Sequence, residues 1–198
     1  MVFSSLQFIF IFMPIFFGCY YIVPDKIKNF ILFIGSLCFY FVGTIHNPEH
    51  FILFILSIVA DFAVGIWIEK FPARKKVLLA TGIIFHLINF AVFKYSGFVI
   101  NEMGRLNPSF NFTADVVLPI GISFYTFQGI SYIVDVYRGN AKAERSLLRY
   151  AVYISMFEQL IAGPIVTYGQ VEKELYKRKI KVSSALKGIG VFVFGVGL

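Results

Sequence analysis

The sequence predicts an all-α protein, a polytopic bundle of transmembrane helices with five spans, a re-entrant element and an incomplete last helix. Of its 198 residues, 58% are hydrophobic and only 15% are charged, whereas soluble domains carry about 25% charged residues. The mean hydropathy is +0.78. The Lys and Arg residues form short clusters between apolar runs, which is the pattern of membrane topology and not of a nucleic-acid-binding face. These observations exclude a soluble protein and a nucleic-acid partner, and they make membrane lipid the expected surrounding.

Five apolar runs are predicted to cross the membrane, because a span needs about 20 mostly apolar residues. The first run has no Lys or Arg before Lys26, so it lacks the basic start of a cleaved signal peptide. We therefore interpret it as a helix of the bundle. The five runs cover residues 2–23, 29–42, 51–68, 77–93 and 116–136.

A sixth apolar run, residues 150–166, is predicted to enter and leave the membrane on one side. If it returns, the connections on one side hold 15 Lys and Arg residues against 2 on the other; a complete crossing gives 10 against 7. The first division fits the positive-inside rule better and places the N-terminus outside. A complete, Pro-kinked span is the alternative. The polar or helix-breaking residues of this re-entrant element are Glu158, Gln159, Gly163 and Pro164.

The end of the sequence gives two further expectations. Residues 169–184 are basic, with Val171, Leu175 and Val182 on one helical face, which predicts an amphipathic helix on the membrane surface; a solvated loop is the alternative. The last run, residues 188–198, would form about 16 Å of helix, too short to cross. We therefore expect residues 1–198 to be the N-terminal part of a single longer membrane domain, or the product of a truncated gene.

The fifth run has a polar side and an apolar side at helical spacing. Ile122, Ile130, Ile133 and Val134 lie on the apolar side, which is expected to face lipid. The polar side should face other helices or a polar channel, because small and hydrogen-bonding residues favour such surfaces; packing and channel lining are equally good interpretations. The channel-lining candidates fall within about 120° of arc: Gly121, Tyr125, Gln128, Ser131, Tyr132 and Asp135.

Ionisable residues inside apolar runs are costly, so each is a candidate for function. Asp61 lies in the third run and His86 in the fourth. We expect His86 to be a packed, hydrogen-bonded residue, since nothing in the sequence pairs it with a nucleophile. Lys94 and Asp135 lie near run ends, where an interfacial role is favoured. The pair His46 and His50 has no evident third ligand, so no metal site is predicted.

Four segments resemble the membrane-bound O-acyltransferase (MBOAT) family, and in particular its alginate O-acetyltransferase-like branch. They are the opening MVFSSLQFIFIFMPIFFGCYYIVP, FKYSGF (93–98), LPIGISFYTFQGISYIVDVYRG (118–139) and LIAGPIVTY (160–168). One departure is Glu158, which stands where many relatives have proline.

The resemblance implies a multi-pass protein of the bacterial inner membrane that moves an acyl group, usually acetyl, across the membrane. The donor would be acetyl-CoA or another acyl thioester on the cytoplasmic side, with no bound cofactor. A periplasmic or extracellular acetyltransferase partner would complete the O-acetylation of alginate or another envelope polysaccharide.

The family's essential histidine would lie beyond residue 198, so no catalytic residue is assigned to this chain, and residues 1–198 are expected to be inactive alone. The alternatives are a component of a polytopic transporter or exporter, and a non-catalytic gene remnant.

Overall fold

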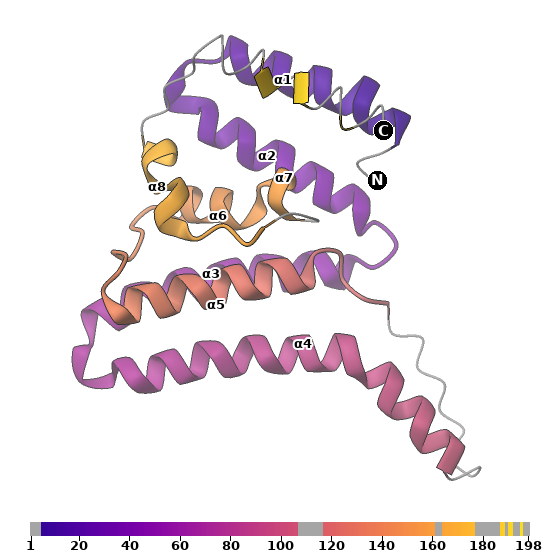
Figure 1. The fold of residues 1–198 in the computed structure, drawn as a ribbon, viewed down its shortest axis with the longest axis vertical. Coiled ribbons are helices and arrows are strands. Elements are labelled where there is room, and N and C mark those ends of the chain that lie inside the picture. The colour runs from indigo at the N-terminus through magenta and orange to yellow at the C-terminus, as the bar shows by residue number, and fades with distance from the viewer. Residues whose placement is uncertain are drawn as a thin grey trace.

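The computed structural model describes residues 5–106, 117–160 and 164–176, together with 187, 188, 190, 191 and 195. In these ranges the regular structure is helical throughout and contains no strand, which confirms the predicted all-α class. Figure 1 shows long helices running side by side, with short ones inserted between them. The elements are η1 (Phe8–Phe12, a π-helical turn), α1 (Met13–Ile22), α2 (Asp25–Gly43), α3 (Pro48–Lys70), η2 (Pro72–Arg74), α4 (Lys75–Leu106), α5 (Ile122–Arg138), α6 (Leu147–Ser155), α7 (Phe157–Leu160) and α8 (Tyr168–Tyr176).

Three helical stretches of the described chain are long and apolar enough to cross a membrane: α2, α3 and Pro72–Met103, which joins η2 to most of α4. The other two predicted spans correspond to shorter helices. Phe8–Ile22 is an apolar helix below span length, and α5 has 17 residues. The chain is thus an integral membrane protein, and the number of complete spans stays a prediction.

The short helix α5 lies at the centre of the bundle, where it contacts α3, α4, α6, α7 and α8. Because neighbours surround it, the prediction that its apolar side faces lipid is wrong for Ile122 and Ile133, which are 1% and 0% exposed. Ile133 fits because Gly82 on α4 has no side chain; a Cβ atom at that glycine would lie 2.7 Å from Ile133 Cδ1. The outward position of α5 is instead Phe127, which is 46% exposed.

Helices α6 and α7 form the inserted element, and the chain breaks between them at Met156. The backbone N–H of Phe157 donates a hydrogen bond to Ser36 Oγ on α2 at 3.3 Å, which satisfies a donor that the break exposes. The Phe157 ring packs among four phenylalanine rings with centroid separations of 5.1–6.0 Å. These rings come from η1, α1 and α2: Phe8, Phe12, Phe16 and Phe39.

The inserted element returns to the end of the bundle from which it starts. Tyr153 on α6 donates a hydrogen bond to the carbonyl oxygen of Val166 at 2.9 Å. Arg149 on α6 and Tyr176 on α8 line one pocket with the start of α2. The re-entrant course through the membrane stays a prediction. Within it, Pro164 is exposed and lies in non-helical backbone, whereas Gly163 lies outside the described residues.

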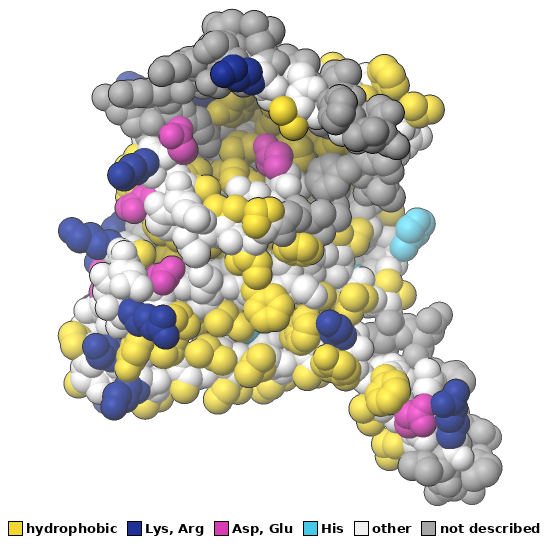
Figure 2. All heavy atoms as spheres, viewed as in Figure 1, with side chains coloured by type: hydrophobic (Ala, Val, Ile, Leu, Met, Phe, Trp, Pro, Cys, Tyr) yellow, Lys and Arg dark blue, Asp and Glu magenta, His cyan; other side chains and the backbone are white. Residues whose placement is uncertain are grey.

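The basic connections meet at one end of the bundle. Arg145 pairs with Glu69 at 2.5 Å, and Lys75 Nζ lies 5.0 Å from the centre of the Tyr137 ring. Lys and Arg side chains gather along the edge that carries the α3–α4 connection (Figure 2), while apolar side chains cover α4 beside them. Segment 137–149 therefore lies beside segment 69–76, and its Arg149 lines one pocket with Lys26 and Lys28 of segment 24–28.

The described part of the predicted surface helix, α8, is amphipathic. Leu175 is buried and Val171 packs against the core, while Lys173 and Glu174 are exposed. Residues 177–184 of this prediction lie outside the described residues, as does most of the run 188–198.

Candidate functional site

A buried cluster of hydrogen-bonded side chains joins three helices in the interior. His86 Nε2 on α4 lies 2.6 Å from Asp61 Oδ1 on α3, and the Tyr150 hydroxyl on α6 donates to Asp61 Oδ2 at 3.2 Å. The exposed fractions are 1% for Asp61 and His86 and 0% for Tyr150. The expectation that His86 is packed and hydrogen-bonded is confirmed. Sequence reasoning did not find the pairing itself, because the two residues lie 25 positions apart on different helices.

Gly129 on α5 leaves the space in which Asp61 and His86 meet. A Cβ atom at this position would lie 2.8 Å from His86 Nε2 and still closer to Asp61 Oδ2. No real Cβ atom makes such contacts, so the absence of a side chain at Gly129 allows α5 to approach α3 and α4 here. Four helices, α3 to α6, therefore converge on one cluster of polar side chains.

A second cluster of polar side chains lies where α5 meets the tip of the inserted element. Gln128 Nε2 donates to Gln159 Oε1 on α7 at 3.4 Å. Gln128 Oε1 and the hydroxyl groups of Tyr125 and Tyr40 are buried and have no hydrogen-bond partner within the described part of the chain. Buried polar atoms are usually satisfied by protein, water or ligand, so these atoms can bind an additional polar group.

The remaining candidates of the polar face lie in different surroundings. The Tyr132 hydroxyl is buried and accepts a hydrogen bond from the backbone N–H of Glu144 at 3.0 Å. Ser131 and Asp135 are half-buried. Gly121 precedes α5 with a φ of +71°, and a Cβ atom there would lie 2.5 Å from the carbonyl oxygen of Leu160 on α7. The polar face thus makes packing contacts along its length.

The structure brings together only part of the predicted site. Tyr125, Gln128 and Tyr132 point into the interior, and Gln159 joins them from α7. Glu158 is exposed on α7, and Lys94 is exposed on α4. None of the six channel-lining candidates lines either of the two pockets described below, and channel lining stays a prediction.

Glu144, which the sequence did not single out, organises the basic end of the inserted element. Its carboxylate accepts hydrogen bonds from the backbone N–H groups of Arg145 and Ser146, both at 2.7 Å. It also accepts from Arg149 Nη2 at 2.8 Å and from the Tyr168 hydroxyl. Burial raises the pKa of Glu144, but the hydrogen bonds from Arg149, Tyr168 and Ser146 outweigh it and hold the pKa below its usual value. No local signal in the sequence marks this role, because Arg149 and Tyr168 come from two different helices, α6 and α8.

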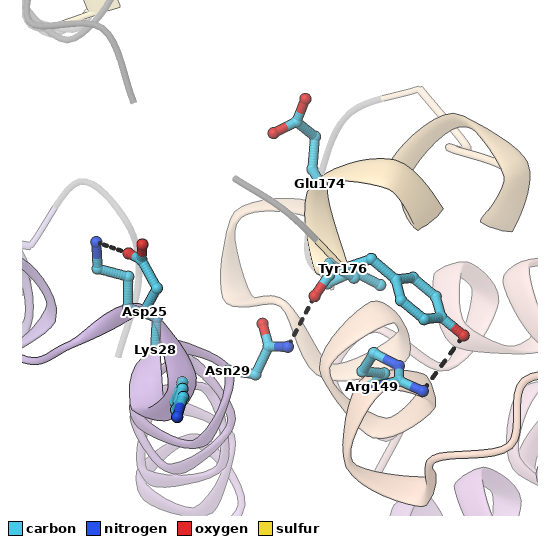
Figure 3. Close-up of a pocket in the computed structure, with 8 residues that line it drawn as sticks. Asp25, Lys28, Asn29, Arg149, Glu174 and Tyr176 are labelled. Atoms are coloured by element: carbon cyan, nitrogen blue, oxygen red, sulfur yellow. Dashed lines mark hydrogen bonds and ion pairs between the residues drawn. The ribbon is translucent and has the colours of Figure 1, made fainter. Parts of the chain in front are cut away.

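A polar pocket of about 320 Å³ opens beside this cluster, between the start of α2 and the end of α8. Figure 3 shows its two walls. Asn29 Nδ2 on α2 donates to the carbonyl oxygen of Leu175 on α8 at 2.9 Å, and Arg149 Nη2 donates to the Tyr176 hydroxyl at 3.3 Å. Lys26 and Lys28 line the α2 wall. The pocket therefore lies at the basic end of the bundle and has cationic groups on both walls.

Curated relatives cover nearly the whole chain. It is 33% identical to the probable alginate O-acetylase AlgI of Pseudomonas aeruginosa, over 98% of this chain and 38% of that protein. The corresponding protein of Azotobacter vinelandii is 34% identical over 98% of this chain and 40% of its own length. The peptidoglycan O-acetyltransferase of Helicobacter pylori is 28% identical over 100% of this chain and 43% of its own length.

The chain spans about two fifths of the length of these relatives. No protein-family model matches it, and no solved structure does. The resemblance to the MBOAT family, carried by the segments around Leu118–Gly139 and Leu160–Tyr168, is nevertheless confirmed by relatives that match from one end of the chain to the other. The chain is therefore an MBOAT-like sequence related to part of the alginate O-acetylases.

Proposed function

We propose that this chain is part of an O-acetyltransferase that passes an acyl group across the membrane to an envelope or exported polysaccharide. The donor is acetyl-CoA or another acyl thioester on the cytoplasmic side, which is the basic end of the bundle. The protein lies in the bacterial inner membrane with its N-terminus outside, and a periplasmic or extracellular acetyltransferase completes the transfer. The names of the relatives support the reaction class.

The observation that carries the proposal is the cluster of polar side chains at the contact between α5 and α7. Transfer of an acyl group places negative charge on the carbonyl oxygen, and hydrogen-bond donors stabilise that charge. The Tyr125 hydroxyl and the Gln128 amide provide donors inside the apolar bundle, 2% and 1% exposed. In this proposal the chain supplies part of the passage wall, while the base comes from the segment that the resemblance places beyond residue 198.

The role of Gln128 is tested in the natural host by changing the chromosomal gene. Gln128→Leu removes the amide at similar volume, and Phe127→Leu changes the exposed neighbour on the same helix as a control. We expect the O-acetyl content of the envelope polysaccharide, measured by NMR, to fall about tenfold or more with Gln128→Leu, because a single donor to a developing oxyanion contributes at least that much. The control should leave it unchanged.

Protein amounts are compared by immunoblot so that loss of folding is distinguished from loss of activity. Normal O-acetyl content with Gln128→Leu, at wild-type protein level, would contradict the role of the α5 face. A deletion strain with unchanged O-acetyl content would contradict the proposed function itself.

The expected inactivity of residues 1–198 alone has its own test. The purified chain is reconstituted in vesicles with a radiolabelled acetyl thioester outside and a soluble oligosaccharide acceptor inside. We expect no transfer above that of protein-free vesicles. Acetylated acceptor formed by this chain alone would show that it contains a complete active site.

A further inference from the structure

An apolar groove of about 390 Å³ runs along the outer side of α1 and α2. Its walls are apolar side chains and two cysteines, and many of them are exposed to the surroundings of the bundle. Ile11 and Ile15 on one wall are 56% and 62% exposed. Gly35 forms part of the floor beside the Phe16 ring. In a membrane this groove faces hydrocarbon.

A chain of contacts through Lys28, which is 9% exposed, connects the polar pocket with the groove. This lysine lines the pocket, and its Nζ lies 5.7 Å from the centre of the Tyr20 ring on α1. Tyr20 in turn stacks on Phe16, a residue of the groove, at 6.0 Å. Ile31, another groove residue, follows Lys28 by one helical turn on α2. One path of contacting residues therefore leads from cationic side chains to apolar ones.

The length of this path matches one leaflet of a bilayer. From Lys28 to Cys38 the helix rises by about 15 Å at 1.5 Å per residue. The hydrocarbon core of a bilayer is about 30 Å thick, so the groove reaches from the polar boundary to about the midplane. An acyl chain whose headgroup lies at the basic end would occupy this length.

The charges at the head of the path suit a phosphate. Lys26, Lys28 and Arg149 line the pocket together with Asp25 and Glu174. Arg149 is already paired with Glu144 at 2.8 Å, so Lys26 and Lys28 are the cations that a phosphate would meet. Asp25 is bonded to Lys28 at 2.6 Å, which leaves the ammonium two further N–H donors. Basic residues at this boundary attract the phosphate groups of lipids.

We propose that the pocket and the groove together bind one phospholipid of the leaflet at the basic end. Its phosphate lies beside Lys26 and Lys28, and one acyl chain lies in the groove between α1 and α2. The site lies away from the cluster of polar side chains between α5 and α7, and it binds a different ligand. The proposal therefore does not depend on the acyltransferase function.

Native mass spectrometry of the 198-residue chain, purified in mild detergent with added phosphatidylglycerol or phosphatidylethanolamine, tests the headgroup part. Lys26→Ala/Lys28→Ala removes two pocket cations, and Lys76→Ala/Lys142→Ala removes two exposed cations of the same end outside the pocket. We expect one tightly bound phospholipid on the wild type and the control, and at least a fivefold lower bound fraction on the pocket variant. Equal binding by all three would overturn the headgroup assignment. Equal binding of glycerol phosphate, which has no acyl chain, would overturn the role of the groove.

Alkylation of Cys19 and Cys38 tests the groove part, because both line it and they are the two cysteines of the chain. N-ethylmaleimide labelling is compared in detergent with and without phospholipid. The reference is Cys19→Ser/Cys38→Ser/Ile52→Cys, whose new thiol lies at a position on α3 that is 60% exposed. We expect phospholipid to slow labelling of the native cysteines several-fold more than labelling at position 52. Equal slowing of labelling at the native cysteines and at position 52 would overturn the proposal. Protection of Cys19 and Cys38 in protein that carries no lipid would also overturn it, because that result would indicate a protein segment in the groove.

Discussion

Asp61 on α3 and His86 on α4 approach within 2.6 Å in the middle of the bundle, with both side chains buried. An ionisable side chain in hydrocarbon is costly unless it has a partner. Each of these residues provides that partner for the other, and Tyr150 adds a third member from α6. The pair therefore fixes how α3, α4 and the inserted element lie against each other, and two predictions depend on it.

Gly129→Ala is expected to destabilise the protein, because the added methyl group would overlap Asp61 and His86. Overpacking of this kind costs about 1–3 kcal/mol, and it should lower the melting temperature in detergent. Gly18→Ala is the matched control, since a Cβ atom there meets nothing within 4 Å. A Gly129→Ala variant that melts with the wild type would show that α5 does not lie this close to the pair.

The contact between Asp61 and His86 can be measured with a double-mutant cycle of Asp61→Ala, His86→Ala and both together. Each single change leaves a buried polar group without its partner, which costs about 1–3 kcal/mol. The double variant should be more stable than the sum of the single losses predicts, with an interaction free energy of about 0.5–3 kcal/mol. Additive losses in the free energy of unfolding would mean that the two side chains do not interact.

Glu144→Gln should reduce stability at neutral pH and have little effect in acid. The pKa of Glu144 is held below its ordinary value of 4.5 in the folded protein, so the ionised carboxylate stabilises the fold above that value. This stabilisation is lost as the pH falls through the lowered pKa. Hydrogen bonds to a charged group contribute about 1.5–3 kcal/mol, which sets the expected loss at pH 7.

Melting curves of wild type and Glu144→Gln between pH 7 and pH 3 measure this difference, and the two curves should converge toward the acid end. The matched control is Glu102→Gln, whose carboxylate on α4 is 40% exposed and pairs with Arg105, so its loss at pH 7 should be smaller than that of Glu144→Gln. A constant gap between wild type and Glu144→Gln would indicate that the carboxylate is not the source of the stabilisation.

Reporter fusions test the course of the inserted element. Reporters placed after Lys70 and after Tyr168 should indicate the same side of the membrane, because both positions lie at the basic end of the bundle. A reporter after His46, in the α2–α3 connection, should indicate the opposite side. Opposite results for Lys70 and Tyr168 would show that α6 and α7 belong to a complete crossing.

The re-entrant course of the inserted element and the membrane side of the basic segments stay predictions. The sequence alone does predict the helical class and the meeting of basic segments 69–76 and 137–149 at one end of the bundle. These properties follow from hydropathy and from Lys and Arg positions, which can be read locally along the chain. The orientation of α5 was predicted only in part. Its polar side does face inward, but Ile122 and Ile133 are buried as well, because α5 has neighbours on almost every side. Periodicity indicates which residues share a face, and it does not indicate how many faces are covered.

The interior contacts could not be predicted, because they join residues far apart in sequence. Glu144 lies in a short connection, and its partners Arg149 and Tyr168 come from α6 and α8. Gly129 is an ordinary helical glycine in the sequence, and its importance depends on two side chains from other helices.

The ring of Phe157 lies among rings contributed by the first forty residues, and its backbone is bonded to Ser36, 121 positions earlier. A ribosome delivers those early helices to the membrane long before it delivers α7. We therefore expect the later hairpin to dock onto a surface that these early aromatic side chains already form. The order of synthesis would then match the order of assembly, and the cost of closing this long loop would fall on the step that docks α7.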